Sequence, residues 1–103
     1  MAQRIIVYWR DIPAQVIVRQ GRAAEKRELP ERFIQAVDRA AMRAGARDGD
    51  AYLAEWRRGP PTPCGDDLAA EADAALAAVV AQYDAARLDA LVRAGGHESA
   101  KDA

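Results

Sequence analysis

The sequence predicts a single α+β domain in which a three-stranded antiparallel sheet and two helices follow the order ββαβα. Three observations predict this class. Two runs rich in β-branched and aromatic residues, 4–10 and 15–19, lie four residues apart, as the strands of a hairpin do. Apolar residues in 33–44 recur every three or four positions, which is the period of a helix. An Ala-rich stretch, 66–94, has strong helix propensity.

The N-terminal hairpin is the densest structural pattern in the chain. Enrichment in β-branched and aromatic residues supports both strands, and both faces of each carry apolar residues. The connection, 11–14, has Asp first and Pro third, and these residues favour turns. Gly21 ends the second strand, and we expect the charged residues 22–28 to form a mobile loop.

The first helix, predicted over 30–44, has a defined beginning and end. Pro30 suits the first helical turn, where its missing N–H costs nothing. Phe33 and Ile34 begin the apolar stripe that continues along the helix. Gly45 then supplies a left-handed stop.

The segment 51–58 has two interpretations. Tyr52, Ala54 and Trp56 share one face at a period of two, which favours a third strand. A helix capped by Asp50 would instead place Tyr52 above Trp56, one turn away. We favour the strand.

The C-terminal half begins with a stiff connector and continues as a long helix. Residues 59–63 contain three prolines, so we expect an extended segment outside any helix or β-ladder. Asp66 or Asp67 caps a helix over 66–94, which unbroken would be about 40 Å long. Because that exceeds a three-stranded sheet, we expect a break near 82–84 or a projecting end.

Domain organisation and localisation follow from length and composition. A chain of 103 residues fits one domain, which we place at 1–95, with a disordered tail at 96–103. No run approaches the roughly 20 apolar residues of a membrane span. One cysteine cannot form an internal disulfide, which suits a reducing compartment. We therefore expect a soluble cytoplasmic protein.

The net charge of −1 conceals an asymmetry between the two halves of the chain. Residues 1–58 hold twelve basic and eight acidic side chains, a net charge of +4. Residues 59–103 hold three basic and eight acidic side chains, a net charge of −5. Such a split can mark a nucleic-acid or membrane face, but we favour two halves that lie against each other. Pairing between chains would instead give a homodimer.

Reactive side chains are few. The chain has one serine (Ser99), one threonine (Thr62) and one histidine (His97), and Ser99 and His97 fall in the predicted tail. A tail cannot hold a nucleophile and its base in register. There is no Cys/His cluster for a metal and no glycine-rich nucleotide loop. We expect no catalytic, cofactor-binding or metal-binding residues, and do not expect an enzyme.

Cys64 is the one candidate reactive thiol. It precedes a predicted helix N-terminus, where the helix dipole lowers a thiol pKa. Asp66 and Asp67 act in the opposite direction. We favour the alternative, a small buried residue beneath the loop.

Aromatic and basic residues suggest an interaction surface. On one sheet face they could form a platform that stacks bases and holds phosphates, as in single-strand binders. They would equally suit a protein interface, and Trp9 is expected in the core. The interaction candidates are Tyr8, Arg10, Arg19, Trp56, Arg57 and Arg58.

Several runs resemble one family. RIIVYWRDIPAQV (4–16), KREL (26–29), DRAAMR (38–43) and DAYLAEWRR (50–58) resemble the bacterial virulence-factor domain, a small domain of uncharacterised biochemical function. The resemblance spans about 3–95. It brings no catalytic residues with it, and it implies an association with folate- and corrinoid-dependent methyl-transfer enzymes of one-carbon metabolism.

These observations lead to one functional expectation and two alternatives. We expect a non-catalytic accessory module that binds another protein, with a methyl-transfer enzyme as the partner that the resemblance implies. A small single-stranded nucleic-acid-binding protein is the first alternative. A redox protein that acts through Cys64 is the second.

Overall fold

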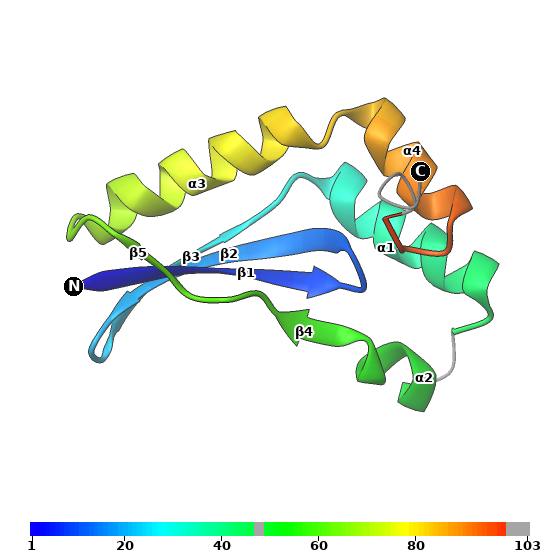
Figure 1. Ribbon diagram of the computed structural model, residues 1–103, viewed down its shortest axis with the longest axis horizontal. Coiled ribbons are helices and arrows are strands. Elements are labelled where there is room, and N and C mark those ends of the chain that lie inside the picture. Colours follow the sequence, from blue (N-terminus) through cyan, green and yellow to red (C-terminus); the bar gives the residue numbers. More distant parts are fainter. Residues whose placement is uncertain (47–48, 99–103) are drawn as a thin grey trace.

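Five β-strands and four α-helices make up the described residues, 1–46 and 49–98, of the computed structural model (Figure 1). The strands pair antiparallel in the order β3-β2-β1-β4, and β5 also pairs with β1. The α+β class is confirmed, although the sheet has five strands where three were predicted. The elements are β1 (Ala2–Trp9), β2 (Ile12–Gln20), β3 (Ala23–Glu28), α1 (Glu31–Ala44), α2 (Gly49–Ala54), β4 (Trp56–Arg58), β5 (Thr62–Cys64), α3 (Leu68–Gln82) and α4 (Ala85–Arg93).

The β1–β2 hairpin turns on two residues, Arg10 and Asp11, and not on the predicted four-residue connection 11–14. Arg10 has a φ of 52°, a left-handed conformation that is uncommon outside glycine. The remaining residues of the predicted loop belong to β2, where the register shifts and Ala14 is left as a bulge. The hairpin was therefore predicted correctly and its turn was not.

The polar segment 22–28 is mostly the edge strand β3, so the prediction of a mobile loop was wrong. Its side chains are anchored by charge. The Arg27 guanidinium lies 2.8 Å from an Asp73 carboxylate oxygen on α3 and 2.9 Å from a Glu25 oxygen on its own strand. Ion pairs replace apolar contacts toward α3, which is why no hydrophobic alternation marks this strand.

The predicted first helix is confirmed as α1. Pro30 is its N-cap, and Gly45 ends it with a φ of 72° while donating its N–H to the carbonyls of the last turn. Phe33 and Val37 are fully buried. Ile34, which was predicted to share their stripe, is 42% exposed.

The segment 51–58 combines the two structures that were weighed for it. Its first part belongs to helix α2, so the predicted strand is wrong there, and its end forms strand β4, paired with β1. The helix α2 places Tyr52 against Trp9 of β1. The Tyr52 carbonyl accepts a 2.9 Å hydrogen bond from Trp9 Nε1, and the two rings stack with centroids 5.8 Å apart.

The connector 59–63 is extended as predicted, but its end joins the sheet as β5. Pro63 pairs opposite Gln3 of β1, which corrects the expectation that the prolines exclude a ladder. A short strand at a sheet edge tolerates proline because one of its sides needs no donor.

The predicted C-terminal helix is divided into α3 and α4 between Gln82 and Ala85, close to the expected break at 82–84. Asp67 caps α3, with its Oδ1 accepting from the Ala70 N–H at 3.2 Å. Asp84 caps α4 in the same way through the Arg87 N–H at 2.9 Å. Figure 1 shows α3 lying along the sheet, and α4 folded beside α1 at the end where the hairpin turns. None of the helices in 1–46 and 49–98 has the length and apolarity to cross a membrane.

The two halves of the chain pack against each other. Arg27 pairs with Asp73, and Arg39 lies 3.4 Å from Asp89 on α4. These contacts join the basic first half to the acidic second half, which is the arrangement we favoured from the charge split. The core between them is apolar and includes Trp9, Ile12, Val16, Val18, Phe33, Val37, Leu88 and Leu91.

Residues that follow α4 fold back onto the hairpin turn. Gly96 is buried, and its carbonyl accepts the Asp11 N–H at 2.8 Å, while the Glu98 N–H donates to Asp11 Oδ2 at 2.7 Å. The disordered tail was expected from residue 96, yet hydrogen bonds hold Gly96 and Glu98 on the hairpin turn, while His97 is exposed. The rest of that tail, 99–103 with Ser99, lies outside the described residues.

Gly96 gives the first prediction. It has a φ of +95°, and a Cβ there would lie 3.0 Å from the Trp9 ring. We expect Gly96→Ala to lower the free energy of unfolding by about 1–3 kcal/mol, measured by urea denaturation. Gly21→Ala is the matched control, since Gly21 also has a positive φ but nothing within 4 Å of a Cβ. Equal losses in the two variants would contradict the proposed contact.

Candidate functional site

The two faces of the sheet differ because α3 covers only one of them. Residues paired across antiparallel strands point to the same face, so Arg27, which reaches α3, identifies the covered face. No helix of the described residues lies across the middle of the other face (Figure 1). This second face, called the open face below, includes Ile5, Val7, Gln15, Ile17, Arg19, Lys26, Glu28, Trp56 and Arg58.

The centre of the open face is apolar. Ile5 and Ile17 pair directly, and they are only 2% and 5% exposed. They are not part of the main hydrophobic core. The register places Lys26 next to Ile17 and Arg58 next to Val7, so long polar side chains flank this apolar centre.

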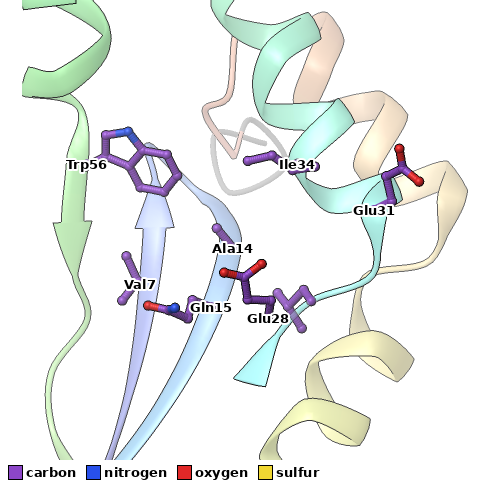
Figure 2. Close-up of a pocket in the computed structure, with 8 residues that line it drawn as sticks. Val7, Ala14, Gln15, Glu28, Glu31, Ile34 and Trp56 are labelled. Carbon is purple, nitrogen blue, oxygen red and sulfur yellow. The ribbon is translucent and has the colours of Figure 1, made fainter. Parts of the chain in front are cut away.

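A groove of about 450 Å³ is hollowed between the open face and α1. In Figure 2, Val7 and Gln15 form its floor, while Trp56 of β4 and Ile34 of α1 stand on opposite sides. Glu28 lies at the β3 end. The volume is within the range of ligand pockets. Trp56 and Ile34 offer apolar surface to one large side chain, and Gln15 and Glu28 are polar groups beside it.

Exposed apolar residues extend the groove along α1 and α2. Ile34 and Met42 of α1 are 42% and 57% exposed, and at eight positions apart they lie about 80° from each other around the helix axis. A second hollow of about 270 Å³ lies between Met42 and Tyr52. Leu53 of α2 is 66% exposed. Apolar exposure gathered in one region is typical of interaction sites.

Three cations on the open face lack an acidic partner. Arg19, Lys26 and Arg58 form no ion pair with any of the residues that the structure describes. They come from β2, β3 and β4 and surround the Ile5–Ile17 pair. The open face therefore carries unpaired positive charge, among the described residues, around an Ile5–Ile17 pair that is itself almost fully buried.

The structure divides the predicted interaction residues between different surroundings. Trp56, Arg58 and Arg19 lie on the open face. Tyr8 and Arg57 point to the covered face, where the Arg57 guanidinium stacks 4.5 Å from the Tyr8 ring centre. The six residues thus do not form one continuous platform.

Arg10 binds its own chain. Its Nη1 donates to the Gly95 carbonyl at 2.8 Å, and its guanidinium lies 5.1 Å from the centre of the Trp9 ring. The Arg10 side chain is only 16% exposed. The left-handed turn therefore aims Arg10 into the fold, and its contacts are structural.

Cys64 lies in strand β5, opposite Ala2 of β1, and not at the start of a helix. Burial raises the pKa of its thiol, and the Glu71 carboxylate raises that pKa further, while Arg4 has the opposite effect. A raised pKa lowers the thiolate fraction at neutral pH, so the structure favours the packed thiol over the reactive one.

Alkylation tests this assignment of Cys64. We expect iodoacetamide to modify the folded protein at pH 7 several-fold more slowly than free cysteine, with the rate rising to the free-thiol value in urea. Mass spectrometry follows the single adduct. A folded-state rate above that of free cysteine would contradict a packed, protonated thiol.

The groove residues Ile34 and Glu28, and Lys26 of the open face, were missed by sequence reasoning. Ile34 was assigned to the buried stripe because it fits the three- and four-residue spacing of the apolar residues in this helix. No spacing distinguishes Ile34, because it lies seven positions from the buried Ala41 and so projects to nearly the same side of the helix.

The fold and its groove define a small α+β domain whose sheet is covered by α3 on one face and carries basic side chains and the groove beside α1 on the other. A family model described as Virulence factor matches residues 7–92, most of the chain, and the protein belongs to this family. The resemblance seen in the sequence is thereby confirmed. The comparisons with curated proteins and with solved structures found no match.

Proposed function

We propose that the protein is an interaction module that docks a partner protein on its open face. The observation that carries this proposal is the groove between Trp56 and Ile34, which adjoins a sheet face whose middle no helix of residues 1–46 and 49–98 crosses. Aromatic and aliphatic anchors in pockets dominate protein interfaces. The groove would receive one such anchor side chain from the partner.

The charged side chains around the groove indicate which kind of partner segment would bind there. The cations Arg19, Lys26 and Arg58 favour carboxylates beside the anchor. Glu28 and Glu31, which line the groove beside β3 and α1, disfavour them there. The occupant is therefore a protein segment with a large apolar residue and acidic residues on one side of it. The family resemblance makes a folate- or corrinoid-dependent methyl-transfer enzyme the first candidate.

Ile34→Asp tests the proposal because it places a charge at the groove wall on an already exposed residue. Affinity capture with the wild-type chain, followed by mass spectrometry and by binding of the purified partner, should give a complex that Ile34→Asp weakens at least tenfold. Gln35→Asp is the matched control, because Gln35 is the next residue of α1 and is also exposed. Equal binding by both variants would contradict docking in the groove.

The same experiments distinguish a protein partner from nucleic acid and from a second copy of this chain. Recovery of only ribosomal and nucleic-acid background, together with a gel shift of single-stranded oligonucleotides at low salt, would replace the protein partner with nucleic acid. Sedimentation with and without salt separates a partner from a second copy of this chain. We expect a monomer in both conditions and no gel shift.

A further inference from the structure

A second candidate site lies on the covered face, apart from the docking groove. Two hollows adjoin there, since Tyr8 and Pro60 line both of them. The larger, of about 210 Å³, is lined by Tyr8, Asp11, Arg57, Pro60, Tyr83 and Glu98. The smaller, of about 120 Å³, is lined by Arg4, Ile6, Tyr8, Gly59, Pro60 and Thr62. We call the two together the tyrosine trough.

The walls of the tyrosine trough are held in place before any ligand arrives. A Cβ at Gly59 would lie 3.0 Å from the Tyr8 ring, so only glycine lets the connector pass this closely. Arg57 stacks on Tyr8, and its Nε donates to the Arg10 carbonyl at 2.9 Å. The Tyr83 ring is likewise backed by a stacked guanidinium, that of Arg87, at 3.9 Å. Preorganised walls reduce the entropy lost on binding.

The carboxylates of the trough already have partners. Asp11 Oδ1 lies 3.0 Å from Arg57 Nη2, and Asp11 Oδ2 accepts the Glu98 N–H. Glu98 Oε1 lies 3.0 Å from Arg87 Nη2. Each negative charge is therefore matched by an arginine, and these groups leave little attraction for a cation.

Other side chains of the tyrosine trough can still donate hydrogen bonds to a ligand. Arg4 forms no ion pair, and the hydroxyls of Tyr8, Tyr83 and Thr62 have no hydrogen-bond partner, among the residues that the structure describes. Burial raises the pKa of Tyr83, so its hydroxyl stays protonated at neutral pH. Arg4 and Thr62 are paired across β1 and β5, which places their side chains on one face at the same end of the trough.

We propose that the tyrosine trough binds a small anion that carries a phosphate or carboxylate group. The oxyanion lies between Arg4 and Thr62, and acceptor atoms further along the ligand meet the hydroxyls of Tyr8 and Tyr83. The proposal rests on donors of the covered face. It is independent of docking on the open face.

The test is a ¹H–¹⁵N NMR titration of the full chain with inorganic phosphate, phenyl phosphate and benzoate at constant ionic strength. Saturable shifts at Thr62 and Gly59 are expected with phenyl phosphate, and weaker ones with inorganic phosphate. Stronger shifts with benzoate would assign the site to carboxylates, and stronger shifts with phenyl phosphate to phosphates. Either result supports the oxyanion site.

Matched variants decide the role of each donor. Arg4→Gln should weaken binding of phenyl phosphate about tenfold, because it removes the charge that meets the oxyanion. Tyr8→Phe should leave that binding nearly unchanged, since phenyl phosphate has no acceptor atom beyond its phosphate for the Tyr8 hydroxyl. Arg93→Gln removes the same charge from α4 and should change nothing. Shifts that never saturate, or equal binding by Arg4→Gln and Arg93→Gln, would overturn the proposal. Ile34→Asp should bind phenyl phosphate normally, which separates this site from the docking groove.

Discussion

Trp9→Ala is expected to lower the free energy of unfolding by about 3–5 kcal/mol. The Trp9 side chain is fully buried, and it joins three parts of the fold. Its ring stacks on Tyr52 of α2, its Nε1 binds the Tyr52 carbonyl, and Gly96 packs against its edge. Alanine would leave a cavity and remove the donor to that carbonyl.

Urea denaturation followed by circular dichroism measures this loss, which is a large fraction of the roughly 5–15 kcal/mol available to a typical domain. Leu53→Ala is the control, since Leu53 is 66% exposed and its loss should stay within about 0.5 kcal/mol. A Trp9→Ala loss below about 1 kcal/mol would contradict the role of Trp9 as the point where hairpin, α2 and C-terminal segment meet.

The double variant Lys26→Glu/Arg58→Glu is expected to weaken binding of the partner about 100-fold, or about 2.7 kcal/mol. Both residues flank the apolar centre of the open face, and reversing them turns attraction for partner carboxylates into repulsion. Isothermal titration calorimetry measures the change. The wild-type affinity should also fall with added salt, because exposed charges are screened.

The matched control for this variant is Arg22→Glu/Arg93→Glu, which makes the same change in net charge. Both control residues are exposed, and they lie in the β2–β3 turn and in α4. This control should bind within about threefold of wild type. An equal loss in the two double variants would assign the effect to net charge and not to the open face.

The hairpin, α1 and the helix break could be predicted because local chemistry alone decides them. Period-two runs formed β1 and β2, Gly45 ended α1, and the length of the C-terminal helix required the break that Asp84 then caps. In each case neighbours in the sequence supply the cause. Such features do not depend on what the rest of the chain does.

The strands β3 and β5 could not be predicted because distant residues hold them. β3 has no apolar alternation and is anchored through Arg27 to Asp73, which lies 46 positions away. β5 contains Pro63 and exists only because β1 offers a free edge beside it. The helix α2 depends likewise on the distant Trp9, which donates to the Tyr52 carbonyl.

The candidate site was predictable in part. Trp56, Arg58 and Arg19 were recognised by residue type and lie on the open face. Arg57 lies between Trp56 and Arg58 in the sequence, yet side chains alternate along a strand, so Arg57 points to the other face. Tyr8, which pairs with Arg57, points to that face as well. Strand pairing was needed to separate the docking groove from the tyrosine trough.

The most direct test of the docking proposal is a methyl NMR spectrum of the chain with and without its partner. Isoleucine and valine methyl groups report on each face separately, because neighbours along a strand point in opposite directions. We expect the methyl groups of Ile5, Val7, Ile17 and Ile34 to shift, and those of Val16, Val18 and Val79 to stay in place. Shifts confined to the second group, or to Ile6 beside the tyrosine trough, would contradict docking on the open face.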